Sequence, residues 1–226
     1  MAVADRPSPN HDARPDGRTV DMLVLHYTGM RDAGSAIERL CDPAAKVSAH
    51  YLIDEDGAVL RLVDENRRAW HAGVAHWQGN TDINARSVGI ELVNPGHEFG
   101  YLPFPETQMT ALVDLAQGIV ARHAIPARNV VGHSDVAPRR KRDPGELFDW
   151  RRLADAGIGL WPEEADGSGD VTEMLTAYGY ETEDLTASVT AFQRHFRPTV
   201  VTGEVDDETL ARLAGLLRLI EAGETA

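Results

Sequence analysis

The sequence has 226 residues, 42% of them hydrophobic, and a formal net charge of −14 at pH 7. This length fits one medium-sized domain followed by a small one, and the composition is sufficient to bury a core. The negative charge argues against nucleic acid as a general partner, and the single cysteine, Cys41, excludes both an internal disulfide and a zinc site built from cysteines.

The N-terminal segment, residues 1–19, is polar and rich in proline, and it is predicted to form an extended arm. It has neither a basic stretch followed by an apolar one nor a cysteine for lipidation, so no export signal is expected. No apolar run of the chain is long enough to span a membrane. These features predict a cytoplasmic protein, with a periplasmic location or export by a non-standard route as the alternative.

Strands alternate with helices over residues 20–160. Strands are expected at 20–28, at 48–64 as a hairpin turning at Asp56-Gly57, at 86–93 and at 129–133, and helices at 32–42, 105–125 and 148–157. The helix over 105–125 has one apolar stripe that would face a core. This alternation is typical of an α/β fold, so a mixed central β-sheet flanked by helices is predicted.

The C-terminal part of the chain has a different character. Residues 161–170 have the Pro, Gly, Ser and acidic composition of a linker. Residues 171–226 are predicted to form a small all-α domain of three short helices, the last one capped by Asp206. From Glu163 onwards there are 14 acidic and 4 basic residues, a net charge of −10, which suggests two units with different surfaces.

Three side chains of the first domain form a candidate metal site. His26 and His133 each end a predicted strand, so the fold can bring them together, and Asp143 lies on a loop that can fold back towards His133. Two imidazoles and a carboxylate, with a fourth position left for water, are the pattern of a catalytic zinc site. A histidine at a strand end can equally be structural, and the pattern alone does not separate these two from His50, His71 and His76.

Two further residues are candidates for proton transfer and charge stabilisation. Lys141 lies two residues before Asp143 and can direct its ammonium group at a bound carbonyl. In "SVGIELV" the apolar residues share one face, and Glu91 points to the other. A carboxylate in an apolar strand is costly unless it is paired or functional. Glu91 is therefore a candidate general base, with a salt bridge to an arginine as the alternative.

Five segments, in this order and spacing, resemble a known family: "LVLHYTGM", "SAHYLIDEDGAVLRLV", "AWHAG", "SVGIELVN" and "VVGHSDVAPRRKRDPG". They are similar to the zinc-dependent N-acetylmuramoyl-L-alanine amidases of the amidase-2 family, which share their fold with phage lysozyme-type amidases and peptidoglycan recognition proteins. The resemblance covers residues 18–160. The tail, with "AFQRHF" and "DDETLARL", resembles the three-helix peptidoglycan-binding module of wall hydrolases; a helical cap that only stabilises the enzyme is the alternative.

The resemblance implies a role for each matching residue. His26, His133 and Asp143 correspond to the ligands of one zinc ion per chain. Glu91 corresponds to the general base, and Lys141 to the residue that stabilises the tetrahedral intermediate.

Residues outside this group are candidates for substrate binding. Trp70 and His71 can line the cleft, with core packing as the alternative. Arg86 can contact an acidic group of the stem peptide, with a salt bridge as the alternative. The basic run 139–142 would give the site a positive rim that suits an anionic muropeptide.

The predicted reaction is hydrolysis of the amide between the lactyl group of N-acetylmuramic acid and L-alanine of the stem peptide. Soluble anhydromuropeptides in cell-wall recycling are the expected substrate; the C-terminal module favours polymeric peptidoglycan as the alternative. Two other functions are considered. A non-catalytic peptidoglycan receptor is disfavoured, because such relatives typically lack a metal ligand and all three matching positions are occupied here; a zinc peptidase that cuts within the stem peptide is the other. No protein partner is evident from the sequence.

Overall fold

The computed structural model describes residues 3–224, so residues 1–2 of the predicted arm and 225–226 of the predicted C-terminal domain lie outside it. The elements in chain order are β1 (Val3–Asp5), β2 (His11–Ala13), β3 (Met22–Tyr27), α1 (Ala33–Cys41), β4 (Tyr51–Ile53), β5 (Val59–Arg61), β6 (Arg67–Ala69), α2 (Ile83–Arg86), β7 (Ser87–Leu92), α3 (Gly96–Phe99), α4 (Glu106–His123), the 3-10 helix η1 (Ala127–Asn129), β8 (Val130–Gly132), α5 (His133–Val136), α6 (Trp150–Asp155), α7 (Val171–Tyr178), α8 (Leu185–Phe196) and α9 (Asp207–Glu224).

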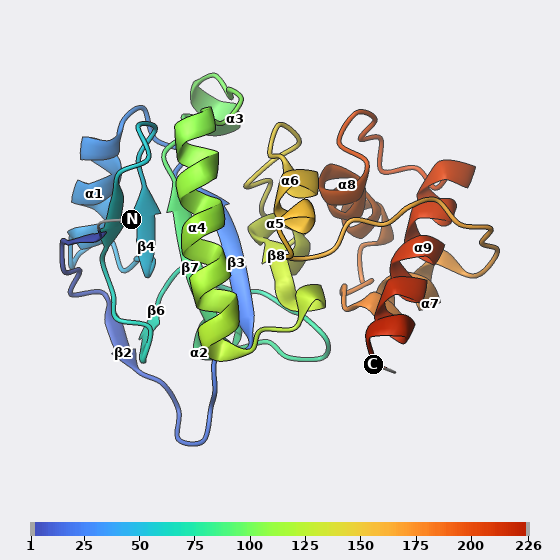
Figure 1. The fold of residues 1–226 in the computed structure, drawn as a ribbon, viewed down its shortest axis with the longest axis horizontal. Coiled ribbons are helices and arrows are strands. Elements are labelled where there is room, and N and C mark those ends of the chain that lie inside the picture. The colour runs from blue at the N-terminus through green and yellow to red at the C-terminus, as the bar shows by residue number, and fades with distance from the viewer. Residues whose placement is uncertain (1–2, 225–226) are drawn as a thin grey trace.

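The central sheet has six strands in the order β1-β5-β4-β7-β3-β8. Its neighbouring strands are parallel except for β4 and β5, which form the predicted antiparallel hairpin. Figure 1 shows α4 lying across one face of this sheet, with the C-terminal helices α7 to α9 at the end of the molecule away from β1. The prediction of a mixed sheet flanked by helices, with a helical C-terminal region, is therefore confirmed.

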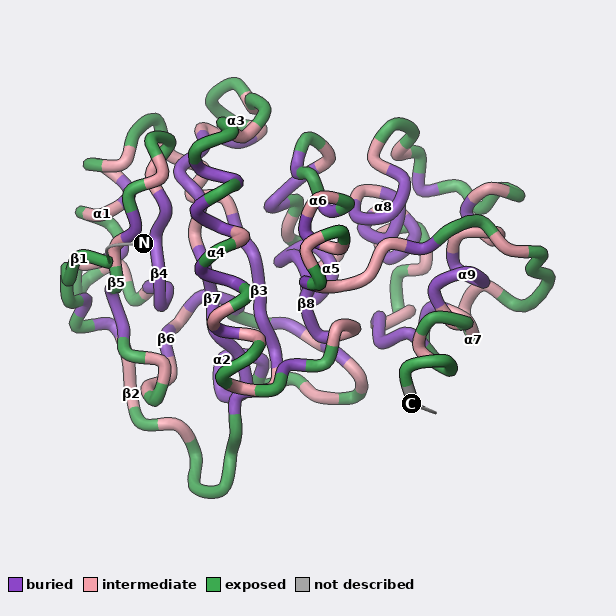
Figure 2. Tube along the Cα trace, viewed as in Figure 1, coloured by how far each residue is buried: buried purple, intermediate pink, exposed green. Residues whose placement is uncertain are grey.

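The face of the sheet that α4 covers is an apolar core. Leu25 of β3 and Ile90 of β7 are fully buried there against Leu112 and Ile119 of α4. Alternate residues of a strand point to the same face, so one set of positions along β3 and β7 supplies this core. Figure 2 shows the resulting buried trace along the central strands.

The opposite face is shared between the site described below and the C-terminal helices. Met22 and Val24 of β3 belong to one hydrophobic cluster with Trp77 and with Phe192 and Phe196 of α8. The acidic side chain predicted to cap the last helix does so, because Asp206 Oδ1 accepts a hydrogen bond from the Thr209 amide at 2.9 Å. No helix among residues 3–224 is both long and apolar enough to cross a membrane.

The N-terminal segment takes a larger part in the fold than an extended arm would. Strand β1 pairs with β5, and β2 pairs with β6 in a separate two-stranded sheet. The Arg14 guanidinium then donates hydrogen bonds to four backbone carbonyls, those of Glu65, Asn84, Ala85 and Ser87. Burial lowers the pKa of Arg14 to about 10. Short strands paired through main-chain groups need no apolar alternation, so the sequence pattern does not reveal them.

Candidate metal centre and active site

The strand register brings three separate parts of the chain to one place. Strand β3 lies between β7 and β8, and His26 of β3 is directly opposite Glu91 of β7. On the other side, Leu25 pairs with Gly132, the last residue of β8, so His133 follows beside His26. Parallel strands end at the same edge of a sheet, and this edge collects the predicted side chains.

The loop between His133 and Asp143 closes on itself. The Ser134 amide donates to the Asp143 carbonyl at 2.9 Å, which returns the aspartate to the start of α5. Beyond it, Gly145 has a φ of +88°, and a Cβ atom there would lie 2.3 Å from the Tyr101 hydroxyl oxygen. Only glycine therefore fits where the chain leaves the site.

Three ligand-type atoms converge at the edge of the sheet. His26 Nδ1 lies 2.9 Å from His133 Nδ1 and 3.1 Å from Asp143 Oδ2, and His133 Nδ1 lies 3.0 Å from the same oxygen. All three side chains are buried. Within residues 3–224, no other three His, Cys, Asp or Glu side chains meet in a group that could hold a metal ion.

The protonation of this cluster suits a metal cation. Burial and the neighbouring His133 lower the pKa of His26 to about 4, although Asp143 acts to raise it. Burial acts to raise the pKa of Asp143, but His133 and His26 bring it well below its usual range. At neutral pH the cluster therefore offers a neutral imidazole and an ionised carboxylate, the forms that bind metal ions. Two nitrogens and one oxygen in this arrangement match the ligand set of a catalytic zinc.

Glu91 presents an unpaired carboxylate beside this cluster. Its Oε2 atom is buried and has no hydrogen-bond partner among the described residues. Burial and the charge of Asp143 raise the pKa of Glu91 well above its usual range, while Lys141 acts to lower it. A buried carboxylate oxygen without a hydrogen-bond partner is unfavourable in a residue with only a structural role. An unpaired carboxylate with a raised pKa is instead expected of a proton-transfer residue beside a metal site.

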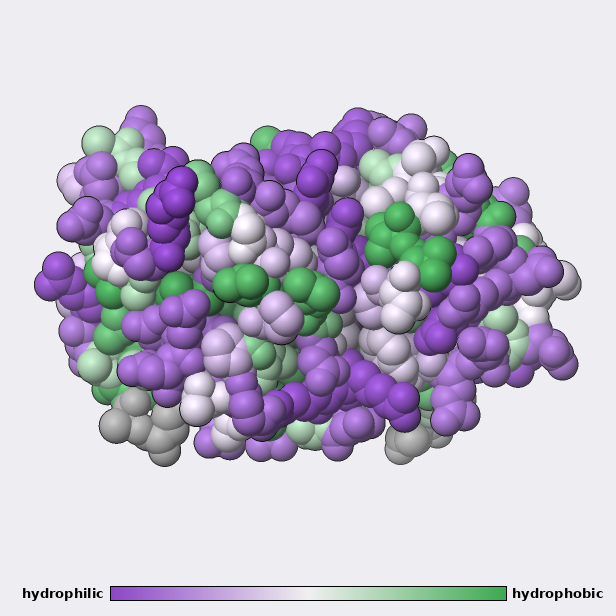
Figure 3. Space-filling view, turned by 90° about the horizontal axis from the view of Figure 1, so that it is seen from above, coloured by the Kyte–Doolittle hydropathy of each residue, from purple (hydrophilic) through white to green (hydrophobic). Residues whose placement is uncertain are grey.

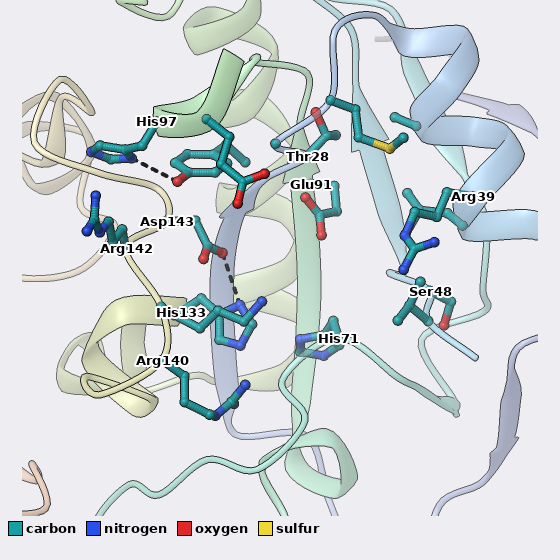
Figure 4. A pocket seen from close by; sticks show the side chains of 18 of the residues that line it. Thr28, Arg39, Ser48, His71, Glu91, His97, His133, Arg140, Arg142 and Asp143 are labelled. Carbon is teal, nitrogen blue, oxygen red and sulfur yellow. Dashed lines mark hydrogen bonds and ion pairs between the residues drawn. The ribbon is translucent and has the colours of Figure 1, made fainter. Parts of the chain in front are cut away.

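The cluster opens into a cleft of about 660 Å³. Its walls include the predicted residues Trp70, His71 and Lys141. Figure 4 shows Arg39, from α1, and Arg142 on opposite sides of this cleft, with the Glu91 side chain between them. The basic side chains support the prediction of a positively charged rim.

Arg86 lies outside the cleft. It directly precedes the first residue of β7, whereas the metal cluster lies at the C-terminal end of that strand. Its buried guanidinium donates to both carboxylate oxygens of Asp21, with Nε to Oδ1 at 2.7 Å. The structure thus gives Arg86 the salt bridge considered as the alternative, and Arg86 is not among the residues that line this cleft.

The cleft also contains residues that the sequence did not single out. The His97 ring stacks on Tyr101, its Nδ1 lies 2.8 Å from the Tyr27 hydroxyl, and its Nε2 lies 3.2 Å from the Glu146 carboxylate. Tyr27 and His97 line the wall next to Asp143. His97 belongs to a four-residue helix without periodicity, so only the position of Tyr27 directly after His26 could have drawn attention to this wall.

The C-terminal helices hold the element that carries His133. Asp135 of α5 accepts a hydrogen bond from the Tyr180 hydroxyl at 2.6 Å, and its other carboxylate oxygen lies 2.7 Å from His195 Nδ1. The buried His195 ring stacks between Trp150 and Phe196. His195 therefore links the C-terminal helices to the element that carries His133.

The face of the molecule seen from above is mostly polar. Figure 3, which looks down on the molecule from above the view of Figure 1, shows mostly hydrophilic side chains with small apolar areas between them.

The mixed sheet, the three-ligand cluster and the unpaired carboxylate together define an α/β-class protein whose candidate metal centre is of the kind found in metal-dependent hydrolases. The family model described as N-acetylmuramoyl-L-alanine amidase matches residues 16–146, and that of a putative peptidoglycan binding domain matches residues 151–213. The chain therefore belongs to the N-acetylmuramoyl-L-alanine amidase family, and its activity is that of an N-acetylmuramoyl-L-alanine amidase.

Its relatives include two Escherichia coli amidases. The sequence is 39% identical to N-acetylmuramoyl-L-alanine amidase AmiD over 88% of this chain and 82% of that protein. It is 37% identical to 1,6-anhydro-N-acetylmuramyl-L-alanine amidase AmpD over 65% of this chain and 87% of AmpD. The extra coverage with AmiD shows that the similarity continues beyond the catalytic domain.

Two solved structures extend the comparison. The complex of AmiD from E. coli with the substrate anhydro-N-acetylmuramic acid-L-Ala-D-gamma-Glu-L-Lys superposes with a TM-score of 0.80, at 36% identity, over 91% of this chain and 92% of AmiD. AmpDh3 from Pseudomonas aeruginosa, in complex with anhydromuramic pentapeptide, gives a TM-score of 0.82 at 35% identity over 91% of this chain and 94% of AmpDh3.

Proposed function

We propose that the protein uses one zinc ion, held by His26, His133 and Asp143, to cleave soluble muropeptides that carry a 1,6-anhydro sugar. The bond cut is the amide between the lactyl group of the muramic acid and L-alanine. The observation that carries this proposal is the convergence of three ligand atoms within 3.1 Å of one another, beside the unpaired carboxylate of Glu91. The anhydromuropeptides bound by AmiD and AmpDh3 support the choice of substrate.

The zinc site, Glu91 and Lys141 each have a separate task in this reaction. A zinc ion bound at this site would act as a Lewis acid, lowering the pKa of water to about 7 and polarising the amide carbonyl. Glu91 accepts the proton of the attacking water on its carboxylate and then donates it to the leaving amine of L-alanine. The Lys141 ammonium stabilises the negative charge that develops on the carbonyl oxygen.

The walls of the cleft would bind the two ends of the substrate. Trp70 offers a flat apolar surface for the sugar or the peptide. Arg39 and Arg142 flank the cleft and can attract the carboxylates of the stem peptide. Neither arginine side chain takes part in a hydrogen bond or ion pair with another described residue, which leaves both available for a ligand.

The experiment that tests the proposal compares two substrates. Purified protein loaded with zinc is incubated with a soluble 1,6-anhydromuropeptide and, in parallel, with insoluble sacculi, and the products are identified by mass spectrometry. We expect release of the intact stem peptide from the soluble substrate, loss of that activity with a chelator, and little effect on sacculi. A cut within the stem peptide would identify a peptidase, and zinc binding without cleavage of either substrate would identify a receptor.

Polymeric peptidoglycan is the second candidate substrate, because the C-terminal region matches a putative peptidoglycan binding domain. Efficient cleavage of sacculi in the same experiment would favour it. The net charge of −10 from Glu163 onwards argues against adhesion to anionic wall polymers by charge alone. A cytoplasmic location would fit the soluble substrate, and cell fractionation with an antibody against the protein tests it.

A further inference from the structure

A two-residue segment at the back of the site contacts both candidate histidine ligands. His26 Nε2 lies 3.0 Å from His71 Nδ1, and His133 Nε2 lies 3.0 Å from the backbone carbonyl oxygen of Ala72. In each ligand ring the bonded nitrogen is the one that does not face Asp143. Neighbouring residues of one segment therefore contact the outer nitrogen of both rings.

The hydrogen bonds beyond His71 have a direction. The Ser87 hydroxyl donates its single proton to the Ile83 carbonyl at 2.7 Å, so towards His71 Nε2, 3.1 Å away, Ser87 can only accept. His71 then carries its proton on Nε2 and has a lone pair on Nδ1. That lone pair accepts from His26 Nε2, which leaves His26 Nδ1 unprotonated and directed at the metal cluster.

The second ligand is oriented by a simpler rule. The Ala72 carbonyl can only accept a hydrogen bond, so His133 must carry its proton on Nε2. The His133 Nδ1 lone pair consequently faces the same point as the lone pair of His26.

The segment itself is held from two sides. The Asn84 side-chain oxygen accepts hydrogen bonds from the backbone amides of His71, at 3.1 Å, and Ala72, at 2.8 Å. On the sheet, the His71 ring packs on Gly89, where a Cβ atom would lie 2.5 Å from His71 Cγ. Ser87, Gly89 and Glu91 are alternate residues of β7, so one face of this strand seats His71 and presents the candidate base.

We propose that His71 and Ala72 fix both histidine ligands in the tautomer that binds metal through Nδ1, with His71, Ser87 and Asn84 as positioning residues. This inference rests on the metal site proposed above. It also gives His71 a task that differs from lining the cleft for substrate. Because the hydrogen bonds are made by the protein alone, the ligand orientation is set before a metal ion binds.

The test measures zinc affinity and the tautomers rather than activity alone. Zinc dissociation constants are determined by competition with a chromophoric chelator for the wild type, His71→Phe, Ser87→Ala and His71→Gln. We expect His71→Phe to weaken zinc binding by ~10–100-fold, the usual effect of losing such a partner. Ser87→Ala should weaken it less, and His71→Gln should recover most of the affinity, because an amide can accept from His26 and donate to Ser87.

Trp70→Ala is the matched control, since Trp70 neighbours His71 in the cleft wall but its side chain makes no hydrogen bond or ring contact with His26 or His133 among the described residues. It should raise KM and leave the zinc dissociation constant unchanged. Long-range 1H–15N correlation spectra of the zinc-free wild type should show His26 and His133 protonated on Nε2. Thermal unfolding of each zinc-free variant identifies any loss of affinity that reflects misfolding.

The outcomes separate the two proposals. If the wild type binds no zinc, the proposed function fails and this inference with it. If the wild type binds zinc but His71→Phe and Ser87→Ala bind it equally well, only the positioning role is wrong. Protonation of His26 or His133 on Nδ1 in the zinc-free wild type would also overturn it.

Discussion

The two faces of the central sheet are built from alternate residues of the same strands, yet they have opposite character. On the α4 face, Leu25 and Ile90 are fully buried in an apolar core. On the other face their neighbours His26 and Glu91 point into the metal cluster and the cleft. Adjacent residues of one strand therefore serve different purposes: one packs in the core and the next belongs to the candidate site.

This difference separates the residues that stabilise the fold from the residues that cost stability. Apolar packing on the α4 face contributes favourable free energy with every buried side chain. On the site face, the Oε2 atom of Glu91 is buried without a partner, and three ligand groups crowd together. The apolar core on the α4 face does not depend on contacts made by the site, so it can offset the unfavourable free energy of the site.

The largest expected effect comes from the site face. Glu91→Gln keeps the size of the side chain but removes the base, so we expect kcat to fall by ~10²–10⁴-fold. Stability should stay the same or rise, because the change removes a buried carboxylate that lacks a partner. Steady-state kinetics and urea unfolding of the same preparation measure kcat and the free energy of unfolding. If Glu91→Gln lowered the free energy of unfolding as much as a core variant does, the contrast between the two faces would be wrong.

Leu25→Ala makes the matching change on the core face, one residue from His26. It should destabilise the protein by ~2–5 kcal/mol through lost contacts and the cavity left under α4. Well below the unfolding temperature, kcat and zinc affinity should stay close to the wild-type values. If this variant lost zinc while still folded, the two faces would be coupled more tightly than the structure indicates.

His195→Leu extends the comparison to the C-terminal helices, which cover the rest of the site face. The leucine would remove one of the two hydrogen-bond partners of Asp135 Oδ2, which keeps the Gly132 amide at 2.7 Å, while the Tyr180 hydroxyl still donates to Oδ1. We expect a loss of ~1–3 kcal/mol in the free energy of unfolding. Since α5 also carries His133, zinc affinity should weaken too, whereas a helical region that only caps the enzyme would change stability without changing affinity.

The sequence predicted the parts of the fold that carry strong local patterns. The apolar runs around His26 and Glu91 and the long amphipathic helix over 105–125 were found because burial imposes periodicity on them. The short strands β1, β2 and β6 were missed, because three residues joined by main-chain hydrogen bonds leave no such pattern.

The site was predicted in part and for a different reason. The spacing of His133, Lys141 and Asp143 made a returning loop plausible, but the resemblance to a family was needed to select His26 among nine histidines. The contacts of Arg86 and His71 could not be predicted from the sequence pattern. Their neighbours in space, Asp21 and Ser87, are set by strand register, which sequence spacing alone does not contain.

The smallest expected effect concerns a polar contact at the end of the core face. Glu65 accepts hydrogen bonds from Tyr51 of β4 and Arg122 of α4, and lies 2.5 Å from His123. Burial acts to raise the pKa of Glu65, but these partners lower it to about 2. Because the folded-state pKa is below the unfolded value of ~4.3, the ionised group stabilises the protein above that value, and this contribution is lost as pH falls towards 2.

Glu65→Gln should therefore lower the free energy of unfolding by ~1 kcal/mol at pH 7, the usual net contribution of such a hydrogen bond. The difference between wild type and variant should shrink as pH falls from ~4.3 towards 2, where the wild-type carboxylate becomes protonated. Urea unfolding of zinc-free protein at pH 7, 4 and 3 measures this difference without competition between protons and metal. If the difference in free energy of unfolding stayed constant across that range, Glu65 would act through packing rather than charge. The α4 face would then be stabilised by apolar contacts even at its polar end.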